Sequence, residues 1–280
     1  MINFQLVEEK LLLRNYSDNT RKVYTSLLRD FERFCREQSL DSQTDAKEFI
    51  LHMIAENKAI ATQNQAINAI KFYWEMVLGK PKSRIDLDRP MKTKPLPSVL
   101  SLEEINRIFK SIRNRKHLMI IKTIYGCGLR IGELCDLKIS DVDGDRMRLH
   151  IRQGKGRKDR FVPLPENLLK ELRVYFKEYR PVEYLFEGQV KRENPEVPQQ
   201  YSPSSIRAVL RRASNKAGIR KSIKVHTLRH SYATHLYEHG VNLRSIQVLL
   251  GHSSSKTTEI YTRVSKQQLD KIPSPLDFLD

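Results

Sequence analysis

The sequence predicts a mainly α-helical protein of two domains, the second of which is an α+β domain with a small β-hairpin or sheet. Three observations support this. Apolar residues recur at helical spacing through most of the 280 residues. A segment with three prolines and no helical periodicity interrupts them at 88–100. Apolar and polar residues alternate strictly at 147–152, as in a strand with one buried face.

The first domain, residues 1–87, is expected to be a bundle of about four helices. In DNTRKVYTSLLRDFERFCRE the apolar residues share one stripe, and Asp18 or Thr20 is the expected N-cap. TDAKEFILHMIAEN and ATQNQAINAIKFYWEMVLG repeat the pattern, and the second ends at Gly79. Because residues 88–100 hold prolines and lysines without periodicity, they are predicted to be a linker.

The second domain, residues 101–280, begins with SLEEINRIFKSI, in which Ser101 and Glu104 have capping-box spacing. RMRLHIRQ alternates, GKGRKD turns the chain and RFVPL returns it, so residues 146–164 are predicted to form a hairpin with a basic tip. Helices are expected to dominate from Glu166 onward, with a short strand at EYLFE.

Positive charge is concentrated in the second domain. The chain holds 50 Lys and Arg against 33 Asp and Glu, a net charge of +17. Residues 1–90 hold 14 against 13, whereas residues 91–280 hold 36 against 20. Such an excess indicates a polyanionic partner, most often nucleic acid, although a basic surface can also serve solubility alone.

Cysteine usage and the N-terminus indicate a reducing compartment. Cys35, Cys127 and Cys135 are odd in number and never form a CxxC pair, so they are expected to be core residues rather than disulfides or zinc ligands. The N-terminal segment carries two glutamates and is too weakly apolar for a signal peptide, and no apolar run could span a bilayer. The protein is expected to be cytoplasmic, or nuclear in a nucleated source, without membrane attachment.

Two glycine-rich segments each present a cation. GLRIGEL places Arg130 directly after a Gly-rich break, with Glu133 one helical turn later. GKGRK places Lys155 between two glycines at the hairpin tip. Taken alone, the first is better explained as a surface ion pair and the second as a solvated turn lysine.

Two further segments carry histidines. HTLRHSYATHL places His226 and Arg229 three residues apart, on one helical face, with Thr227 as the expected N-cap. Free N–H groups at such a helix start favour an anion. LLGHSSSKTTEIYT places His252 after a helix-ending glycine and Tyr261 nine residues later. A structural histidine and a core aromatic are the alternative interpretations.

The order and spacing of these residues carry more information than any one of them. Along the chain come Arg130, Lys155, His226, Arg229, His252 and Tyr261, with gaps of 25, 71, 3, 23 and 9 residues. In these motif contexts the set resembles the tyrosine recombinase (phage-integrase-like) family. The resemblance covers nearly the whole chain, since residues 1–87 resemble the family's SAM-like core-binding domain and residues 101–280 its catalytic domain.

Within the family the chain is most similar to Xer-type recombinases, with integron integrases as near relatives. Integron integrases have an added helix between the hairpin and the HxxR segment, and EGQVKRENPEVPQQYSPSS is too short to supply it. The resemblance implies a site-specific recombinase that cuts and rejoins DNA through a covalent 3′-phosphotyrosine intermediate and a Holliday junction, without metal or ATP.

The residues themselves suit that chemistry. A phosphodiester under in-line attack gains negative charge, which the forked guanidinium groups of Arg130 and Arg229 can bind. Tyr261 would be the nucleophile, His226 would accept its proton, and the surrounding positive charge would lower the phenol pKa from about 10. The sequence shows no carboxylate cluster for Mg²⁺ and no GxxxxGK[ST] loop, so no cofactor is expected.

The resemblance implies roles for three further residues. Lys155 would protonate the leaving 5′ oxygen, His252 would hydrogen-bond the scissile phosphate, and Glu133 would hold the Arg130 region in place. It also implies a homotetramer on two DNA sites, with the apolar tail at 266–280 docking on a neighbouring subunit. Whether an accessory protein takes part stays open.

Basic side chains outside this set are expected to bind double-stranded DNA. Arg157 and Lys158 belong to the hairpin tip. Arg207, Arg211 and Arg212 belong to the helix SSIRAVLRRASNKAGIRK, for which a solvated face is the alternative. Two other functions also stay open: a type IB topoisomerase-like relaxing enzyme, and a non-cutting DNA-binding accessory protein.

Overall fold

The computed structural model describes residues 1–42, 45–81, 97–152, 159–189, 194, 196–251, 258–259 and 261–262. The chain divides into two compact units, Met1–Lys94 and Pro95–Asp280, each with a hydrophobic core of its own. The division falls within the predicted linker at 88–100, most of which lies outside the described residues.

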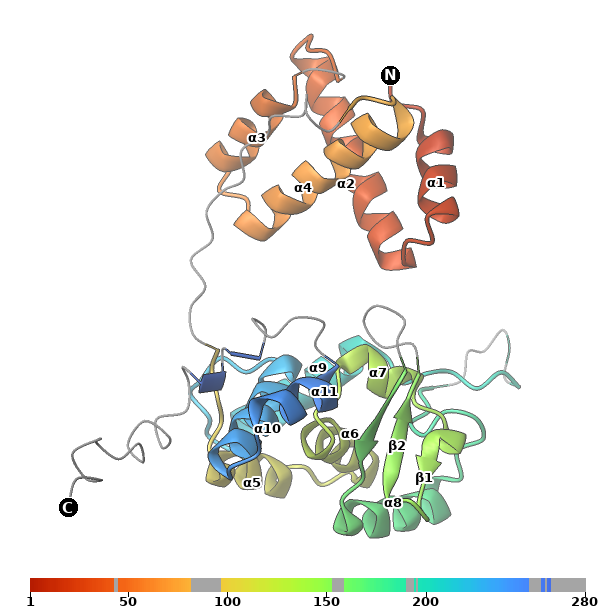
Figure 1. Ribbon diagram of the computed structural model, residues 1–280, viewed down its shortest axis with the longest axis vertical. Helices are drawn as coiled ribbons and strands as arrows, with labels where there is room; N and C mark the ends of the chain where they lie inside the picture. Colours follow the sequence, from red (N-terminus) through yellow and green to blue (C-terminus); the bar gives the residue numbers. More distant parts are fainter. Residues whose placement is uncertain are drawn as a thin grey trace, which may run out of the picture. The chain divides into compact units, whose positions relative to one another are not determined.

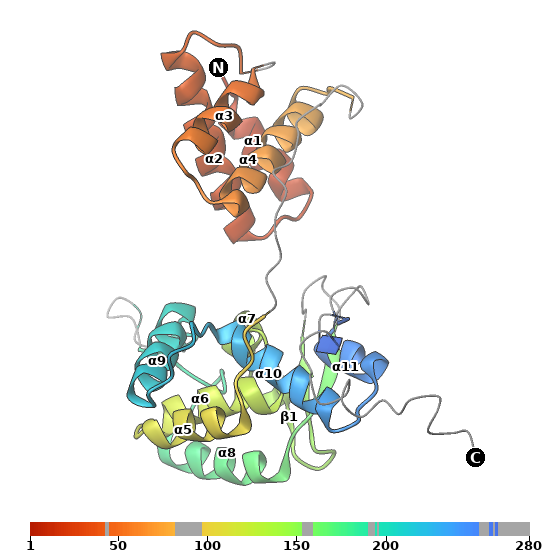
Figure 2. The same ribbon diagram turned by 90° about the vertical axis from the view of Figure 1, so that its left-hand side faces the viewer.

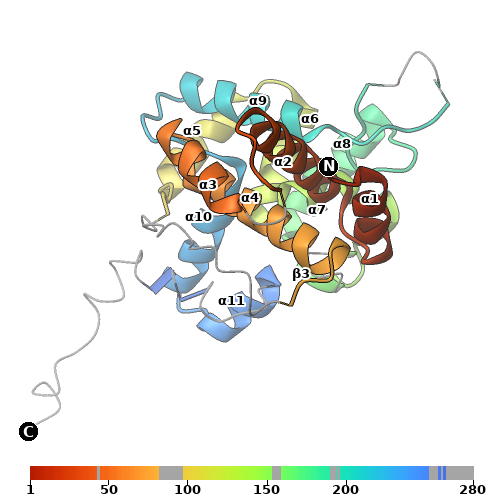
Figure 3. The ribbon, with the colours of Figure 1, turned by 90° about the horizontal axis from the view of Figure 1, so that it is seen from above.

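The first unit is entirely helical where it is described. Its elements are α1 (Phe4–Leu13), α2 (Asp18–Glu37), α3 (Ala46–Ala55), α4 (Ile60–Phe72) and the π-helical turn η1 (Tyr73–Val77). The long α2 packs against α1, α3 and α4 (Figures 1 and 3). The predicted bundle of about four helices is therefore confirmed.

The start of α2 differs from the prediction. Its N-cap is Ser17, whose hydroxyl accepts the Thr20 N–H at 3.3 Å. Asp18, one of the two expected caps, is already helical, whereas Ser17 has the extended backbone of a capping residue. The observed cap lies one residue before Asp18 and three residues before Thr20, so the predicted cap was wrong.

The second unit is an α+β domain. Its helices are α5 (Leu102–Ser111), α6 (Arg115–Gly126), α7 (Ile131–Asp136), the short 3₁₀ helix η3 (Ile139–Asp141), α8 (Glu166–Tyr179), α9 (Pro203–Lys216), α10 (Val225–Glu238) and α11 (Leu243–Leu250). α6 contacts α5, α7, α8, α9 and α10, so it forms the centre of this unit (Figure 2). α11 packs against α10 and against a strand of the sheet (Figure 3).

The sheet contains the predicted hairpin and a strand that was not predicted. Antiparallel β2 (Arg148–Ile151) and β3 (Arg160–Pro163) form the hairpin, and β1 (Val142–Asp143) pairs with the other edge of β2. Leu149 and Ile151 are buried, as the alternation predicts. The strand expected at EYLFE is not formed: Tyr184 and Glu187 make only isolated bridges, to Lys138 and Gln200.

Several local predictions are confirmed. Ser101 and Glu104 form a capping box, since Ser101 Oγ accepts the Glu104 N–H and Glu104 Oε2 accepts the Ser101 N–H. Cys35, Cys127 and Cys135 are buried free thiols.

In the part of the chain that the structure describes, no helix is both long and apolar enough to cross a membrane.

Candidate active site

A tight glycine turn carries Arg130. Gly128 has a φ of +61°, and a Cβ there would lie 2.5 Å from the ring of Tyr232, so this position requires glycine. The turn delivers Arg130 to the N-cap of α7. There its backbone N–H donates to Glu133 Oε2 at 2.8 Å and its guanidinium donates to Glu133 Oε1 at 2.6 Å. Arg130 and Glu133 are thus in contact, as their spacing predicts.

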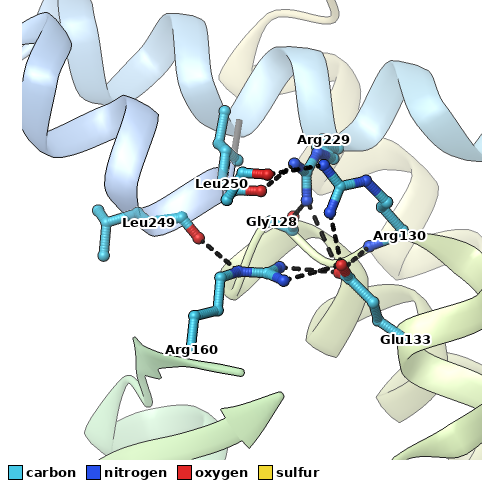
Figure 4. A network of polar contacts seen from close by, with 8 residues as sticks. Gly128, Arg130, Glu133, Arg160, Arg229, Leu249 and Leu250 are labelled. Carbon is cyan, nitrogen blue, oxygen red and sulfur yellow. Dashed lines mark hydrogen bonds and ion pairs between the residues drawn. The ribbon is translucent and has the colours of Figure 1, made fainter. Parts of the chain in front are cut away.

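Glu133 is the centre of a buried ion-pair network that the sequence did not reveal (Figure 4). Arg160, at the start of β3, donates to both of its carboxylate oxygens at 2.8 Å. Burial by itself would raise the pKa of Glu133. The hydrogen bonds and charge of Arg160, together with those of Arg130, outweigh burial and lower it to about 2. Glu133 therefore stays ionised and holds two arginines in place.

Arg229 is fixed from three directions. Its side chain is fully buried, one terminal nitrogen donates to the Gly128 carbonyl at 2.7 Å, and the other donates to the Leu250 carbonyl (Figure 4). Glu133 Oε2 lies 3.7 Å from Nη1 of Arg229. Burial, followed by the charge of Arg130, lowers the pKa of Arg229 to about 10. Its guanidinium thus stays charged at neutral pH, and its position is set by α10, the glycine turn and the end of α11.

The helix that carries Arg229 starts earlier than predicted. α10 begins at Val225 with Lys224 as N-cap, and the Thr227 hydroxyl accepts the Lys224 N–H at 3.2 Å. Thr227 therefore lies in the first turn, and its expected capping role was wrong because Lys224 already has the extended backbone that ends the preceding loop. His226 is consequently the second helical residue, exposed at the helix start.

Tyr261 belongs to the same site as Arg130 and Arg229. It is 1% exposed and packs with Ala233, Ile246 and Leu250. Its hydroxyl lies 3.3 Å from Nδ1 of His230. The nucleophile predicted from sequence is therefore held against α10 and α11 of its own chain.

The charge environment of Tyr261 corrects one expectation. Arg229 and Arg130 do lower the pKa of its phenol, but burial raises it by more, so the net pKa lies above the ordinary value. The sequence indicates only which charges could lie nearby, whereas the sign depends on how much water the fold removes from the hydroxyl. Tyr261 is thus protonated at neutral pH.

The predicted DNA-binding arginines of α9 divide into two groups. All three are exposed. Arg207 and Arg211 line a hollow of about 670 Å³, together with Lys224 and His226 from the start of α10. Arg212 lines a different hollow, beside His117. Only the first pair therefore adjoins the site that holds Arg130 and Arg229.

The structure brings Arg130, Glu133, His226, Arg229 and Tyr261 into one site. The remaining predicted residues and the tail lie outside the described residues: Lys155, Arg157, Lys158, His252 and 266–280. No group of three His, Cys, Asp or Glu that could hold a metal ion occurs within the described ranges.

Two members of the site, Arg160 and His230, were not predicted from the sequence. Arg160 lies two residues before the buried Val162, on the same face of β3, and an arginine on the buried face of a strand indicates an ion pair. His230 follows Arg229 directly and lies one helical turn after His226. These signals were present in the sequence, but their partners, Glu133 and Tyr261, could not be read from spacing.

Comparison with known proteins places the chain in a family. The phage integrase family matches residues 98–268, and the N-terminal SAM-like domain of phage integrases matches residues 4–84. The chain is similar to tyrosine recombinase XerA of Pyrococcus furiosus, with 36% identity over 273 residues that cover 96% of this chain and 92% of that protein. It is also similar to a putative integrase/recombinase of Sinorhizobium fredii, with 33% identity over 278 residues, 98% of this chain and 88% of the relative.

Solved structures of recombinases are also similar to this chain. A crystal structure of XerA recombinase is 29% identical, with a TM-score of 0.56 over 96% of this chain and 95% of that one. A structure of XerH site-specific recombinase bound to a palindromic difH substrate has a TM-score of 0.69 over 98% and 84% of the two chains at 23% identity, and shows the shared fold. The chain therefore belongs to the phage integrase family of tyrosine recombinases.

Its resemblance to the Xer recombinases is confirmed by these relatives. They do not favour the two alternatives, a type IB topoisomerase-like enzyme or a non-cutting accessory protein, because the relatives are named recombinases and integrases.

Proposed function

We propose that the protein is a site-specific DNA recombinase in which Tyr261 attacks a DNA phosphate and forms a covalent 3′-phosphotyrosine. The observation that carries the proposal is the proximity of one phenol to two fixed guanidinium groups. Tyr261 lies close enough to Arg229 and Arg130 for both charges to act on its hydroxyl. Preorganised cations beside an attacking oxygen are what phosphoryl transfer requires.

Arg130 and Arg229 are proposed to bind the nonbridging oxygens of the scissile phosphate. Because Glu133 and the carbonyls of Gly128, Leu250 and Gly251 already fix both guanidinium groups, little reorganisation is needed when negative charge develops. His226 was expected to accept the Tyr261 proton, but the Tyr261 hydroxyl lies against His230 instead. His226, exposed at the first turn of α10, is therefore proposed to donate a hydrogen bond to the same phosphate.

Lys155 and His252 complete the proposed mechanism. Lys155 protonates the departing 5′ oxygen, whose high pKa makes it a poor leaving group without a proton. His252 hydrogen-bonds the phosphate. The phosphotyrosyl bond retains the energy of the broken phosphodiester, so the 5′ hydroxyl of a second strand can attack it and rejoin DNA through a Holliday junction.

Double-stranded DNA is the proposed partner, bound by both units. Arg207 and Arg211 extend positive charge from the site along α9, and Arg157 and Lys158 are proposed to add phosphate contacts from the hairpin tip. Assembly is proposed to be a homotetramer on two DNA sites, in which residues 266–280 dock on a neighbouring subunit.

Trapping of the covalent adduct tests the function. The DNA carries the cognate site and a nick that lets a short fragment escape after cleavage, so that the wild type accumulates a 3′ adduct. Tyr261→Phe keeps the ring and loses the attacking oxygen, and is expected to bind this DNA normally without forming an adduct. An adduct formed by Tyr261→Phe would show that another residue is the nucleophile.

A second assay separates recombination from topoisomerase activity. Supercoiled plasmids with two cognate sites, one site or none are incubated with the wild-type protein. A recombinase yields recombinant products from plasmids that carry the site, most readily from the two-site plasmid, and none from the plasmid without sites. Relaxation of the plasmid without sites at a comparable rate would support the topoisomerase-like alternative instead.

A further inference from the structure

His230 lies against the hydroxyl of Tyr261. It lies on α10, one helical turn after His226, and is half-buried. Its Nδ1 is 3.3 Å from Tyr261 Oη, and the two rings lie with their centroids 5.8 Å apart. The ring of His226 packs edge-on against His230 with centroids 4.4 Å apart. His230 thus lies between the exposed histidine and the phenol.

We propose that His230 is a catalytic base, accepting the Tyr261 proton during cleavage and returning it during rejoining. This inference rests on the proposed function, in which Tyr261 attacks DNA. A general base must lie within hydrogen-bond reach of the proton it removes, and such contacts are often long before substrate binds. The 3.3 Å separation meets this requirement.

The charges around both groups suit this role. His226 and Arg229 on the same helix, and Tyr261 opposite, are the titratable or charged groups that face His230 in the described part of the chain. Burial, then the charges of His226 and Arg229, lowers the pKa of His230 to about 4. At neutral pH the ring is therefore uncharged. A proton on Nε2 leaves the Nδ1 lone pair directed at Tyr261.

Bound DNA would strengthen this base when it is needed. The phosphate brings negative charge beside His230 and partly neutralises Arg229, and both effects favour the protonated imidazole. The pKa of His230 is thus expected to rise on DNA binding. Without DNA, the raised pKa of Tyr261 and the lowered pKa of His230 keep the proton on the phenol.

Tyr261 Oη forms a bond to phosphorus while its proton passes to His230 Nδ1. The bond from phosphorus to the 5′ oxygen breaks, and that oxygen takes a proton from a separate donor, proposed above to be Lys155. In rejoining, a 5′ hydroxyl loses its proton to that donor and attacks phosphorus, and His230 protonates the departing Tyr261 oxygen.

Substitution of His230 with a pH-resolved readout tests the inference. Cleavage is measured from pH 7 to 9 on DNA with a 5′-bridging phosphorothiolate, whose sulfur leaves without a proton, so only activation of Tyr261 limits the rate. His230→Ala is expected to cleave about 100-fold more slowly near pH 7. Because hydroxide must then remove the proton, the deficit should shrink by up to about tenfold per pH unit.

Two further variants separate proton acceptance from positioning. His230→Asn places an amide oxygen near the Nδ1 position, so it can accept the hydrogen bond but not the proton. It is expected to show the same pH-dependent deficit as His230→Ala. His239→Ala, at the end of the same helix, is the matched control. It should cleave at the wild-type rate, because the His239 ring hydrogen-bonds to the His235 carbonyl more than two helical turns after His230.

Several outcomes would overturn the inference. A deficit of constant size from pH 7 to 9 would show a structural role, as would wild-type cleavage by His230→Asn. Unchanged cleavage by His230→Ala would remove His230 from the mechanism. These results leave the proposed function intact, which fails only if Tyr261→Phe still forms the adduct. DNA affinity and circular dichroism of each variant verify that it folds and binds.

Discussion

Arg160 holds both carboxylate oxygens of Glu133 at 2.8 Å, while its Nε donates to the Leu249 carbonyl at 2.9 Å (Figure 4). One side chain thereby joins β3, which returns from the Lys155 hairpin, to α7, which carries Arg130, and to the end of α11, which leads to His252. Close packing adds to this, since Gly251 has a φ of +60° and a Cβ there would lie 3.0 Å from Arg160 Cδ. Arg160 therefore positions segments from which the proposed catalytic residues come.

Replacement of Arg160 should impair both stability and cleavage. Arg160→Met leaves a carboxylate that is 6% exposed with fewer cations, and removing one partner of a buried pair costs about 3 kcal/mol. Cleavage should fall by about tenfold or more, because Arg160 no longer holds Glu133, the partner of Arg130, in place. Urea unfolding and adduct formation measure the two effects. Lys170→Met, which breaks an exposed pair with Glu166, is the control and should change neither.

Arg160→Lys tests whether a positive charge at this position is enough, without the forked guanidinium group. A lysine keeps the charge but cannot donate to both Glu133 oxygens and to Leu249 together. Intermediate stability with cleavage close to that of Arg160→Met would show that the forked geometry matters for positioning. Wild-type cleavage by Arg160→Lys would contradict the positioning role.

Acid should remove the stability that Glu133 contributes. The folded-state pKa is about 2 against 4.5 for the free side chain. Because the pKa of Glu133 is lower in the folded than in the unfolded state, its ionised carboxylate stabilises the fold above pH 4.5. This contribution is lost as pH falls from about 4.5 towards 2. Its full size is on the order of 3 kcal/mol.

Urea unfolding of the wild type and of Glu133→Gln at several pH values measures the stability that the Glu133 charge contributes. At pH 7 the variant should be less stable towards urea, and the difference should narrow steadily below pH 4.5. A difference that stays constant from pH 7 to pH 3 would mean that the Glu133 charge is not the source of the stabilisation.

Alanine variants of Lys155 and Arg229 should lose DNA cleavage for different chemical reasons. Lys155→Ala is expected to cleave ordinary DNA slowly and to recover on the 5′-bridging phosphorothiolate, because the sulfur leaves without a proton. Arg229→Ala should not recover, because it lacks charge stabilisation of the attacked phosphate. Single-turnover cleavage of both substrates tests this, and equal recovery of the two variants would refute the division of roles.

Arg207 and Arg211 should contribute more to DNA binding than Arg212. The first two line the hollow beside His226, whereas Arg212 lies beside His117. Replacing either Arg207 or Arg211 by alanine should reduce the slope of log affinity against log salt by about 1, the loss of one phosphate contact. Arg212→Ala is the control within the same helix. A reduction of equal size in all three variants would indicate a uniformly bound helix face.

Local patterns in the sequence determined the helices, the hairpin and most of the candidate site. Helical and strand periodicities depend on neighbours a few residues apart, so the Ser101 capping box and the buried Leu149 and Ile151 could be predicted directly. Six motif residues at family spacing indicated the recombinase chemistry, because each motif is a short local segment.

Only the tertiary structure decided how these segments meet. Arg160 reaches Glu133 across 27 residues, and His230 rather than His226 meets the hydroxyl of Tyr261. The fold also reversed the expected pKa shift of Tyr261, since burial outweighs two nearby arginines. Long-range ion pairs and the removal of water depend on which surfaces pack together in three dimensions, and residue spacing does not encode that packing directly.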